Sequence, residues 1–438
     1  MKTSSTFHRK IYIDSSLGSS KFLILIWIFI AGMFSPLLAQ NSTLHQFVTE
    51  TGRIYQNDLA TDGIYLFGTK YDGGATGSGY IYKIRPDGTG FDILHNFNAS
   101  EDGLNPVGAL VYSDSVLYGM TIFGGAYDQG VIFSMRTDTA VYKKLLDFDG
   151  INGTMPYASL MVSGTVLYGL SINGGHQSNG IAFKINTDGS GFKDLLDFDG
   201  NNGWNPVGSL VLSGASLFGV TNRGGTHDQG VIFKVDTSGS LYENLHDFNG
   251  TDGAQPFGAL TIKDSVLYGT TMQGGPNSGG VLFRIDTSGA YFQEFNIFSS
   301  AEGINPQGTL NLIDSTLYGM TTNGGWGGQG IIYKINLDGG GYKTLYHFDG
   351  ITGVNPNCSL LRIDSTFFAY IPGGEFNYGT IFSIDTSGNG FQKLMDFTAS
   401  NTGYDPKGSL LYTPDALYGM TQAGGIYNKG VIYKLNPD

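Results

Sequence analysis

A period of about 50 residues runs through this chain and limits what it can fold into. Prolines recur every 50 residues from position 106 to position 406, and a Gly-Gly pair and a phenylalanine each recur eight times. Self-similarity at a fixed period of roughly 20–50 residues is the sequence signature of repeat architectures. The fold is therefore expected to be a series of similar units and not a set of unrelated domains.

Each unit contains four short stretches with strand character. In the unit that begins at Pro206 they span residues 208–212, 216–221, 231–235 and 241–248. Their β-branched and aromatic content, and the Gly, Asn, Asp and Ser residues between them, are typical of strands joined by turns. None has the length or the 3.6-residue periodicity of a helix. Four antiparallel strands in each repeat predict the blade of a β-propeller.

The number of units and the two ends of the array indicate a closed ring. Residues 41–438 hold about eight periods. They begin with a fourth-strand sequence at residues 42–47 and end with a third-strand sequence at residues 431–435. An open array would normally carry dissimilar capping repeats, and these ends are not caps. We therefore predict an all-β, eight-bladed propeller of four-stranded antiparallel blades, closed by pairing the N-terminal strand with the C-terminal blade.

The repeat resembles two known families. In outline it is kelch-like, but Phe or Tyr stands where kelch repeats have a tryptophan after the third strand. It is more similar to the GloVer tandem repeat of secreted bacterial proteins, whose signature looks like residues 267–275 (LYGTTMQGG) followed by residues 280–285 (GVLFRI). The resemblance covers residues 42–438. It implies a propeller of bacterial secreted or cell-surface proteins and leaves the function open.

The first 40 residues have the features of a secretory signal peptide. Basic residues precede a short apolar run at residues 22–34, and Ala39 offers a small residue for cleavage. The run is short for a membrane span of about 20 residues, so an uncleaved anchor is the weaker interpretation. We predict a signal peptide at 1–40 and a propeller at 41–438. The mature chain is expected to be secreted or at the cell surface, with the periplasm as the alternative compartment.

Charge and cysteine content exclude several classes of function. Removing residues 1–40 leaves 20 Lys and Arg against 36 Asp and Glu, a formal charge of −16. Such a chain repels phosphate backbones and anionic lipids, so we expect no nucleic-acid partner and no membrane insertion. A monomer is expected. Cys358 is the one cysteine, and most other repeats have Gly or Ala at its position. It is predicted to be a small buried side chain and not a nucleophile.

The loops between the second and third strands are the predicted recognition elements. Their glycine frame is constant while the residues inside it vary, which suits a binding face; drift of surface loops is the alternative. Aromatic rings, amides and carboxylates together favour a glycan, or else an extracellular protein, as partner. The candidate ligand-binding residues are Tyr127, Asp128, His176, His227, Asp228, Trp204, Trp326, Glu375, Phe376 and Tyr427.

A catalytic function is the alternative to binding. Paired carboxylates from neighbouring blades would make a glycan-active hydrolase or lyase, and Asp128, Asp228 and Glu375 are the candidates. The spacing of the histidines predicts no site: His45 and His246, for example, occupy the same place on different outer strands. The sequence favours a secreted binding or scaffold protein, with catalysis left open.

A second pattern of oxygen-bearing side chains follows the fourth strand. Short Asp and Asn side chains line up there as they do in calcium loops, although the same residues form ordinary turns. No cofactor other than calcium is suggested. The candidate calcium ligands are Asp147, Asp149, Asn152, Asp197, Asp199, Asn202, Asp247, Asn249 and Asp252.

One repeat departs from the others. Residues 367–374 read FFAYIPGG, where the other repeats have sequences close to LYGMT before the glycine pair. Glu375 follows directly. The additional aromatic residue and the proline indicate either a specialised pocket or a local repacking.

Overall fold

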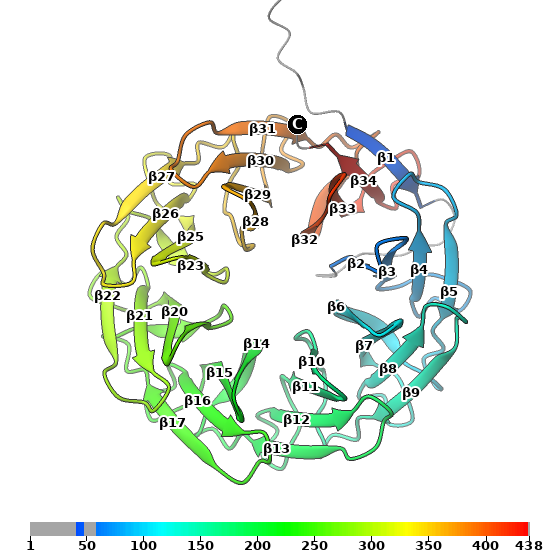
Figure 1. The fold of residues 1–438 in the computed structure, drawn as a ribbon, viewed down its shortest axis with the longest axis horizontal. Coiled ribbons are helices and arrows are strands. Elements are labelled where there is room, and N and C mark those ends of the chain that lie inside the picture. The colour runs from blue at the N-terminus through cyan, green and yellow to red at the C-terminus, as the bar shows by residue number, and fades with distance from the viewer. Residues whose placement is uncertain (1–40, 48–57, 437–438) are drawn as a thin grey trace, which may run out of the picture. The chain divides into compact units, whose positions relative to one another are not determined.

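The computed structural model describes residues 41–47 and 58–436, and these form eight β-sheets arranged in a ring (Figure 1). Each sheet is a blade with four strand positions, which we name a to d from the centre of the ring outward. No helix occurs among the described residues. The predicted fold class, an all-β eight-bladed propeller, is confirmed. The predicted signal peptide lies outside the described residues.

The strands occupy equivalent positions in every blade. The a strands are β2 (Ala60–Thr61), β6 (Leu104–Ser113), β10 (Met161–Ser163), β14 (Trp204–Ser213), β18 (Ala254–Pro256) with β19 (Thr261–Lys263), β23 (Ile304–Pro306) with β24 (Asn311–Ile313), β28 (Leu361–Ile363) and β32 (Tyr404–Thr413). The b strands are β3 (Leu66–Lys70), β7 (Val116–Phe123), β11 (Val166–Ser171), β15 (Ser216–Arg223), β20 (Val266–Gln273), β25 (Thr316–Asn323), β29 (Thr366–Ile371) and β33 (Ala416–Ala423). The c strands are β4 (Tyr80–Ile84), β8 (Val131–Arg136), β12 (Ile181–Asn186), β16 (Val231–Asp236), β21 (Val281–Asp286), β26 (Ile331–Asn336), β30 (Thr380–Asp385) and β34 (Val431–Leu435). The d strands are β5 (Asp92–Asn96), β9 (Tyr142–Asp147), β13 (Lys193–Asp197), β17 (Tyr242–Asp247), β22 (Gln293–Ile297), β27 (Lys343–His347), β31 (Gln392–Asp396) and β1 (Asn41–Gln46).

We number the blades along the chain, so that β2–β5 form blade 1 and β32–β34 with β1 form blade 8. All neighbouring strands in a blade are antiparallel, and the c and d strands of most blades shift register by one residue part-way along. Such bulges increase the local twist of a sheet. The strands predicted in blade 4 are all present, and β14 begins four residues earlier than predicted because Trp204 pairs with Arg223.

A glycine in the b strand makes room for an aromatic ring from the c strand. Gly219 pairs with Phe233, and a Cβ atom at position 219 would lie 2.5 Å from Cζ of that ring. The same relation holds between Gly119 and Phe133. A Cβ atom at this distance would clash with the ring, which explains why Gly stands at this place in seven of the eight blades. In blade 7 the equivalent residue is Ala369, which is buried.

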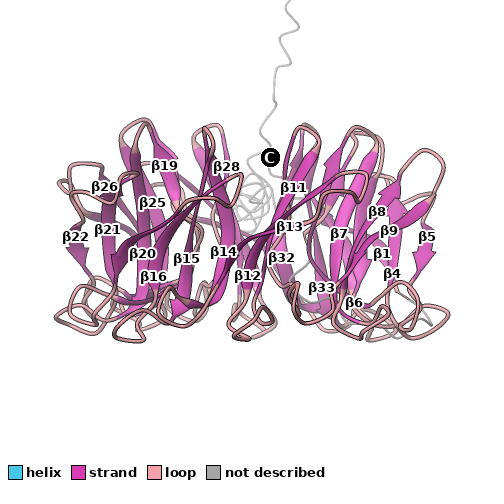
Figure 2. Cartoon of the chain, turned by 90° about the horizontal axis from the view of Figure 1, so that it is seen from below, coloured by secondary structure: helices cyan, strands magenta, loops and turns pink. Residues whose placement is uncertain are grey.

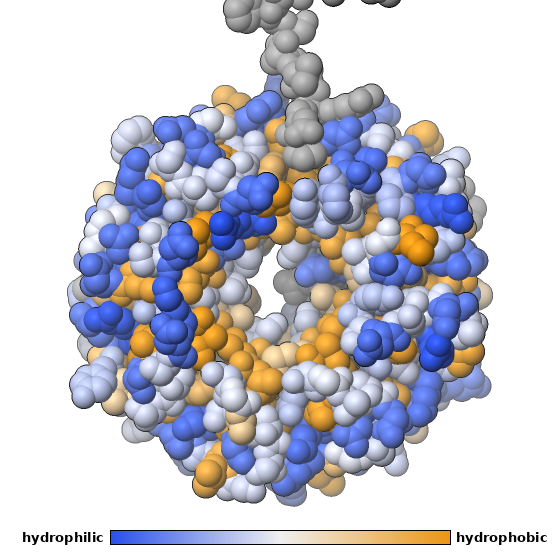
Figure 3. All heavy atoms as spheres, in the orientation of Figure 1, coloured by the Kyte–Doolittle hydropathy of each residue, from blue (hydrophilic) through white to orange (hydrophobic). Residues whose placement is uncertain are grey.

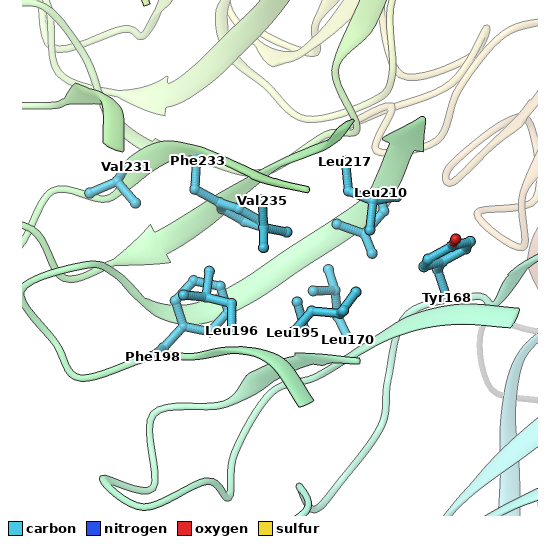
Figure 4. Close-up of a cluster of buried hydrophobic side chains, with 11 residues drawn as sticks. Tyr168, Leu170, Leu195, Leu196, Phe198, Leu210, Leu217, Val231, Phe233 and Val235 are labelled. Carbon is cyan, nitrogen blue, oxygen red and sulfur yellow. The ribbon is translucent and has the colours of Figure 1, made fainter. Parts of the chain in front are cut away.

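Most of the core lies between neighbouring blades. The cluster between blades 3 and 4 joins Leu195 and Phe198 of one blade to Leu217 and Phe233 of the next (Figure 4). The phenylalanine that recurs after the d strands is almost completely buried at every occurrence. These residues are Phe47, Phe97, Phe148, Phe198, Phe248, Phe298, Phe348 and Phe397. Each blade is thus held by the next one, since truncation of such a buried ring costs about 3–5 kcal/mol.

Aromatic stacking also joins adjacent blades at the rim. His45 of blade 8 stacks on Phe91 beside β5, with ring centroids 3.8 Å apart, and His246 of blade 4 stacks on Phe292 at 3.5 Å. Phe91 and Phe292 occupy the place where kelch repeats have a tryptophan. These histidines therefore contribute to blade contacts at separate places on the ring.

Strand β1 completes blade 8. It runs antiparallel to β34, with Asn41 opposite Leu435 and Gln46 opposite Val431. Gln46 also accepts a hydrogen bond through Oε1 from the backbone N–H of Ile426 at 2.7 Å. The first and last described strands of the ring thus lie side by side (Figure 1).

A buried lysine lies where blade 1 meets blade 8. Lys70 stands at a b-strand position that is Thr in most blades. Its Nζ donates to the carbonyl oxygen of Lys429 at 2.9 Å and lies 3.9 Å from the ring centroid of Phe47. Burial lowers the pKa of Lys70 to about 7.

Among the described residues, no helix is long and apolar enough to cross a membrane.

Candidate functional site

The loops of the ring fall on two faces (Figure 2). Because the strands of a blade alternate in direction, the d–a and b–c loops emerge on one face and the a–b and c–d turns on the other. The first face, which we call the loop face, carries every candidate ligand-binding residue. Its b–c loops share one conformation, with both residues of each glycine pair at positive φ, for example Gly124 at 78° and Gly125 at 79°.

Two predicted ligand-binding carboxylates hold their own loops in shape. Asp128 accepts a hydrogen bond from the backbone N–H of Gly124 at 2.9 Å, and Asp228 accepts one from Gly224 at the same distance. Both aspartates have a positive φ, a conformation that Asp and Asn tolerate better than most residues. Their first role is therefore to fix the turn that presents the neighbouring aromatic side chains.

The predicted aromatic residues are exposed on this frame. Trp326 is the most exposed, at 90%, and stacks on His347 with ring centroids 4.2 Å apart. Trp204 lies beside Arg223, with the guanidinium 5.9 Å from its ring centroid. The other exposed rings of the set are Tyr127, Phe376 and Tyr427. They come from several blades and form a discontinuous rim of aromatic groups.

The remaining candidates do not assemble into a catalytic centre. His176 contacts the carboxylate of Asp197 through its ring Nδ1 and its backbone N–H, while His227 is exposed. Oε2 of Glu375 lies 3.9 Å from Nζ of Lys393. Asp128, Asp228 and Glu375 belong to blades 2, 4 and 7, which are not adjacent. The described residues thus bring no two of these three carboxylates onto neighbouring blades.

The candidate calcium loops use their oxygen atoms for local hydrogen bonds. Asp149 accepts from the backbone N–H of Asn152 at 2.8 Å, and the Asn152 side chain accepts from Asp149 N–H at 2.7 Å. Asp199 and Asn202 form the same pair of bonds. In the third loop Asp252 accepts from the N–H of Asn249.

The first carboxylate of each loop is also engaged. Asp147 accepts from the backbone N–H of Ala126 and pairs with Lys144, and Asp247 accepts from the N–H of Thr226. Asp197 likewise accepts a hydrogen bond from the backbone N–H of His176 and also contacts its ring Nδ1. Within the described part of the chain, no group of three or more His, Cys, Asp or Glu side chains is placed to hold a metal ion. Calcium binding stays a prediction for experiment.

A cavity of about 440 Å³ lies at the centre of the ring, and the sequence did not single out its residues. We call it the axial cavity. Figure 3, which views the ring from the side of the a–b and c–d turns, shows a hollow at the centre of the ring. The lining residues are Gly108, Tyr157, Ala158, Ser159, Ile172, Asn205, Pro206, Val207, Gly208, Ser209, Phe257, Gly258, Ala259, Gln307, Gly308, Thr309, Asn357 and Ser359.

Among the described residues, the lining of the axial cavity carries no charged side chain. Amide groups come from Asn205, Gln307 and Asn357, and aromatic rings come from Tyr157 and Phe257. Most of these residues lie at the starts of the a strands, just after the d–a loops, so the cavity belongs to the loop face. Some hydroxyl groups are already used: Ser159 Oγ, for instance, accepts from the N–H of Ala109 at 3.1 Å. The arrangement offers hydrogen bonds and ring contacts without net charge.

Cys358 lies next to this cavity and has no features of a nucleophile. Its Sγ donates to the carbonyl oxygen of Tyr370 at 3.0 Å. Burial raises the pKa of the thiol to about 12. A reactive cysteine needs the opposite shift, because the thiolate is the nucleophile.

Comparison with known sequences identifies the repeat. A family model described as the Gloeobacter/Verrucomicrobia repeat matches residues 33–169, 162–325 and 264–438. The chain belongs to this family. The predicted GloVer resemblance is therefore confirmed along the whole propeller. A search of curated proteins finds no match to this Gloeobacter/Verrucomicrobia repeat chain.

Solved structures resemble this member of the family in fold alone. An oligogalacturonate lyase in complex with manganese has a TM-score of 0.50 at 13% identity, over 87% of this chain and 98% of the lyase. The β-propeller domain of the Trilobed protease from Pyrococcus furiosus has a TM-score of 0.45 at 10% identity, over 81% and 98% of the two chains. At such low identity neither likeness carries the activity of the other protein to this one.

Proposed function

We propose that this protein is a secreted or cell-surface binding propeller that holds a neutral glycan in the axial cavity. One observation carries the proposal: the described lining residues of the cavity combine amide and hydroxyl groups with two aromatic rings, and none of them is charged. Sugar hydroxyls pair with amides and hydroxyls, and the apolar faces of sugar rings pack on aromatic rings. The exposed aromatic side chains on the b–c loops lie around this cavity on the same face and would add contacts to a longer ligand.

A binding role fits the geometry of the axial cavity better than the activity of a glycan hydrolase or lyase. General acid–base cleavage of a glycosidic bond requires two carboxyl groups separated by roughly 5–9.5 Å around the bond. Within residues 41–47 and 58–436, no carboxyl group lines the axial cavity. The candidate carboxylates Asp128 and Asp228 are engaged in holding their loops.

Affinity electrophoresis against neutral and anionic polysaccharides, with a glycan array, tests the proposal. We expect retardation by at least one neutral polysaccharide and little loss of binding at high salt, since no ion pair contributes. The cavity variant Phe257→Ala/Gln307→Ala should weaken binding about tenfold or more, in line with the loss of a ring contact and a hydrogen bond.

Two further variants locate the site. Trp326→Ala/Tyr127→Ala, on the b–c loops, should weaken binding less than the cavity variant. Tyr291→Ala, a ring 88% exposed in a c–d turn on the opposite face, is the matched control and should leave binding unchanged. Absence of binding to every glycan, or equal binding by wild type and cavity variant, would overturn the proposal. Release of products from the polysaccharide would favour the enzymatic alternative.

A further inference from the structure

Blade 7 differs from the others at the end of its b strand. Tyr370 stands where blades 2 and 8 have Met120 and Met420, and Pro372 follows the last residue of β29, Ile371. Proline has no N–H to donate to the sheet, so strand pairing ends there. The chain therefore turns toward the b–c loop after Ile371.

A small pocket lies between this end of blade 7 and the start of blade 8. Its volume is about 240 Å³, and Tyr370, Pro372, Tyr378, Tyr404 and Asp405 are among its lining residues. The ring centroids of Tyr378 and Tyr404 lie 5.3 Å apart at 40°, so the two rings pack against each other and form one aromatic wall of the pocket. We call it the tyrosine pocket.

A third hollow, whose lining includes Lys407, adjoins both the tyrosine pocket and the axial cavity. That hollow, of about 290 Å³, shares Tyr370 with the tyrosine pocket and shares Asn357 and Ser359 with the axial cavity. The three hollows thus form a row that leads from the centre of the ring to the junction of blades 7 and 8. The wall of the middle hollow is fixed, because the Asp58 carboxylate accepts a hydrogen bond from the backbone N–H of Ser409.

The chemistry of the tyrosine pocket fits a neutral ring with hydroxyl groups. Asp405 pairs with Lys407 at 2.9 Å, so the pocket offers no net charge to an organic cation or to an anion. A carboxylate has about four acceptor positions, and one ion pair leaves others for hydroxyl donors. The tyrosine rings supply apolar faces, and Asn377 adds an amide. This is the same combination that lines the axial cavity.

We propose that the ligand is an extended neutral saccharide chain, and that the tyrosine pocket is a second subsite which holds a sugar unit away from the axis. The row of hollows gives the chain its path between the two subsites. The chemical class of the ligand rests on the function proposed above, while the second subsite is a separate statement about the length of ligand that the protein recognises.

Titration calorimetry with a series of oligosaccharides tests the second subsite. The series runs from one to about eight units of the neutral polysaccharide that binds best. For the wild type we expect affinity to increase with chain length and then to level off once both subsites are filled. Tyr378→Ala/Tyr404→Ala should lower the affinity for the longest chains about tenfold and leave that for mono- and disaccharides unchanged.

Controls separate this inference from the proposed function. Tyr291→Ala, an exposed ring on the opposite face, should leave all affinities unchanged, and Phe257→Ala in the axial cavity should lower them for every length. Tyr378→Ala alone lies in a loop and serves if the double variant has a lowered thermal midpoint. Unchanged long-chain affinity in the tyrosine variants would overturn the second subsite. No binding of any saccharide by the wild type would overturn the proposed function.

Discussion

Truncation of one phenylalanine measures how strongly β1 holds the ring together. Phe47 follows β1 and is 2% exposed, in a cluster with Tyr82 of blade 1 and Tyr418 of blade 8. Phe148 has the equivalent position in blade 2 and is also completely buried. If β1 is an integral strand of blade 8, Phe47→Ala and Phe148→Ala should destabilise the protein equally.

The expected magnitude follows from the burial of the two rings. Replacing a buried Phe by Ala costs about 3–5 kcal/mol, because transfer energy and packing are both lost. The entropy of unfolding is about 2.1 cal/mol/K per residue, so a ring of roughly 390 residues that unfolds as a unit loses about 4–6 °C in Tm.

Differential scanning calorimetry of the wild type and the two variants is the assay. The structure predicts that the two shifts in Tm agree within about 2 °C, each several degrees in size. Removing residues 41–47 should lower Tm further, since it also exposes the edge of β34 and an exposed edge promotes aggregation. The reasoning is refuted if Phe148→Ala lowers Tm and Phe47→Ala does not.

Three other predictions concern individual groups. Burial lowers the pKa of Lys70 from 10.5 to about 7, so the free energy of unfolding of the wild type should fall by about 1.4 kcal/mol per pH unit as pH falls from about 10.5 to 7. A plot of Tm against pH should be flatter for Lys70→Thr, and parallel plots for the two proteins would contradict this. If the loops at 147–153, 197–203 and 247–253 bind calcium, Tm should rise in millimolar calcium and fall in chelator, whereas equal midpoints would leave these loops as ordinary turns. Cys358 is partly buried and its thiol pKa is raised to about 12, so it should react with iodoacetamide much more slowly in the folded than in the denatured protein, as followed by mass spectrometry; fast reaction of the folded protein would contradict the raised pKa.

The fold could be predicted from the sequence because every determinant recurs. The 50-residue period sets the repeat, and the places of Gly219 and Phe233 in it reflect a contact that each blade repeats. The start of β14 was missed because Pro206 argues against a strand, yet a proline is tolerated on an edge strand that faces the axis.

The candidate functional site was harder to predict from the sequence than the fold. Loop residues such as Tyr127 and Trp326 are exposed as expected, because their glycine frames place them at loop tips. Sequence patterns did not show that Asp128 and Asp228 are engaged within their own loops, since this depends on the loop conformation. The axial cavity collects residues from six blades, which meet only when the ring closes. The one sequence signal for the axial cavity was the small residue two positions after each recurrent proline, such as Gly208 after Pro206.

Hydrogen–deuterium exchange with and without a saturating neutral oligosaccharide tests most directly where this propeller binds its ligand. If the ligand lies in the axial cavity, bound saccharide should slow exchange at the starts of the inner strands, at 157–159, 205–209, 257–259 and 307–309, more than anywhere on the a–b and c–d turns. Slowed exchange confined to the opposite face or to the outer strands, with the inner strands unchanged, would contradict the proposed site.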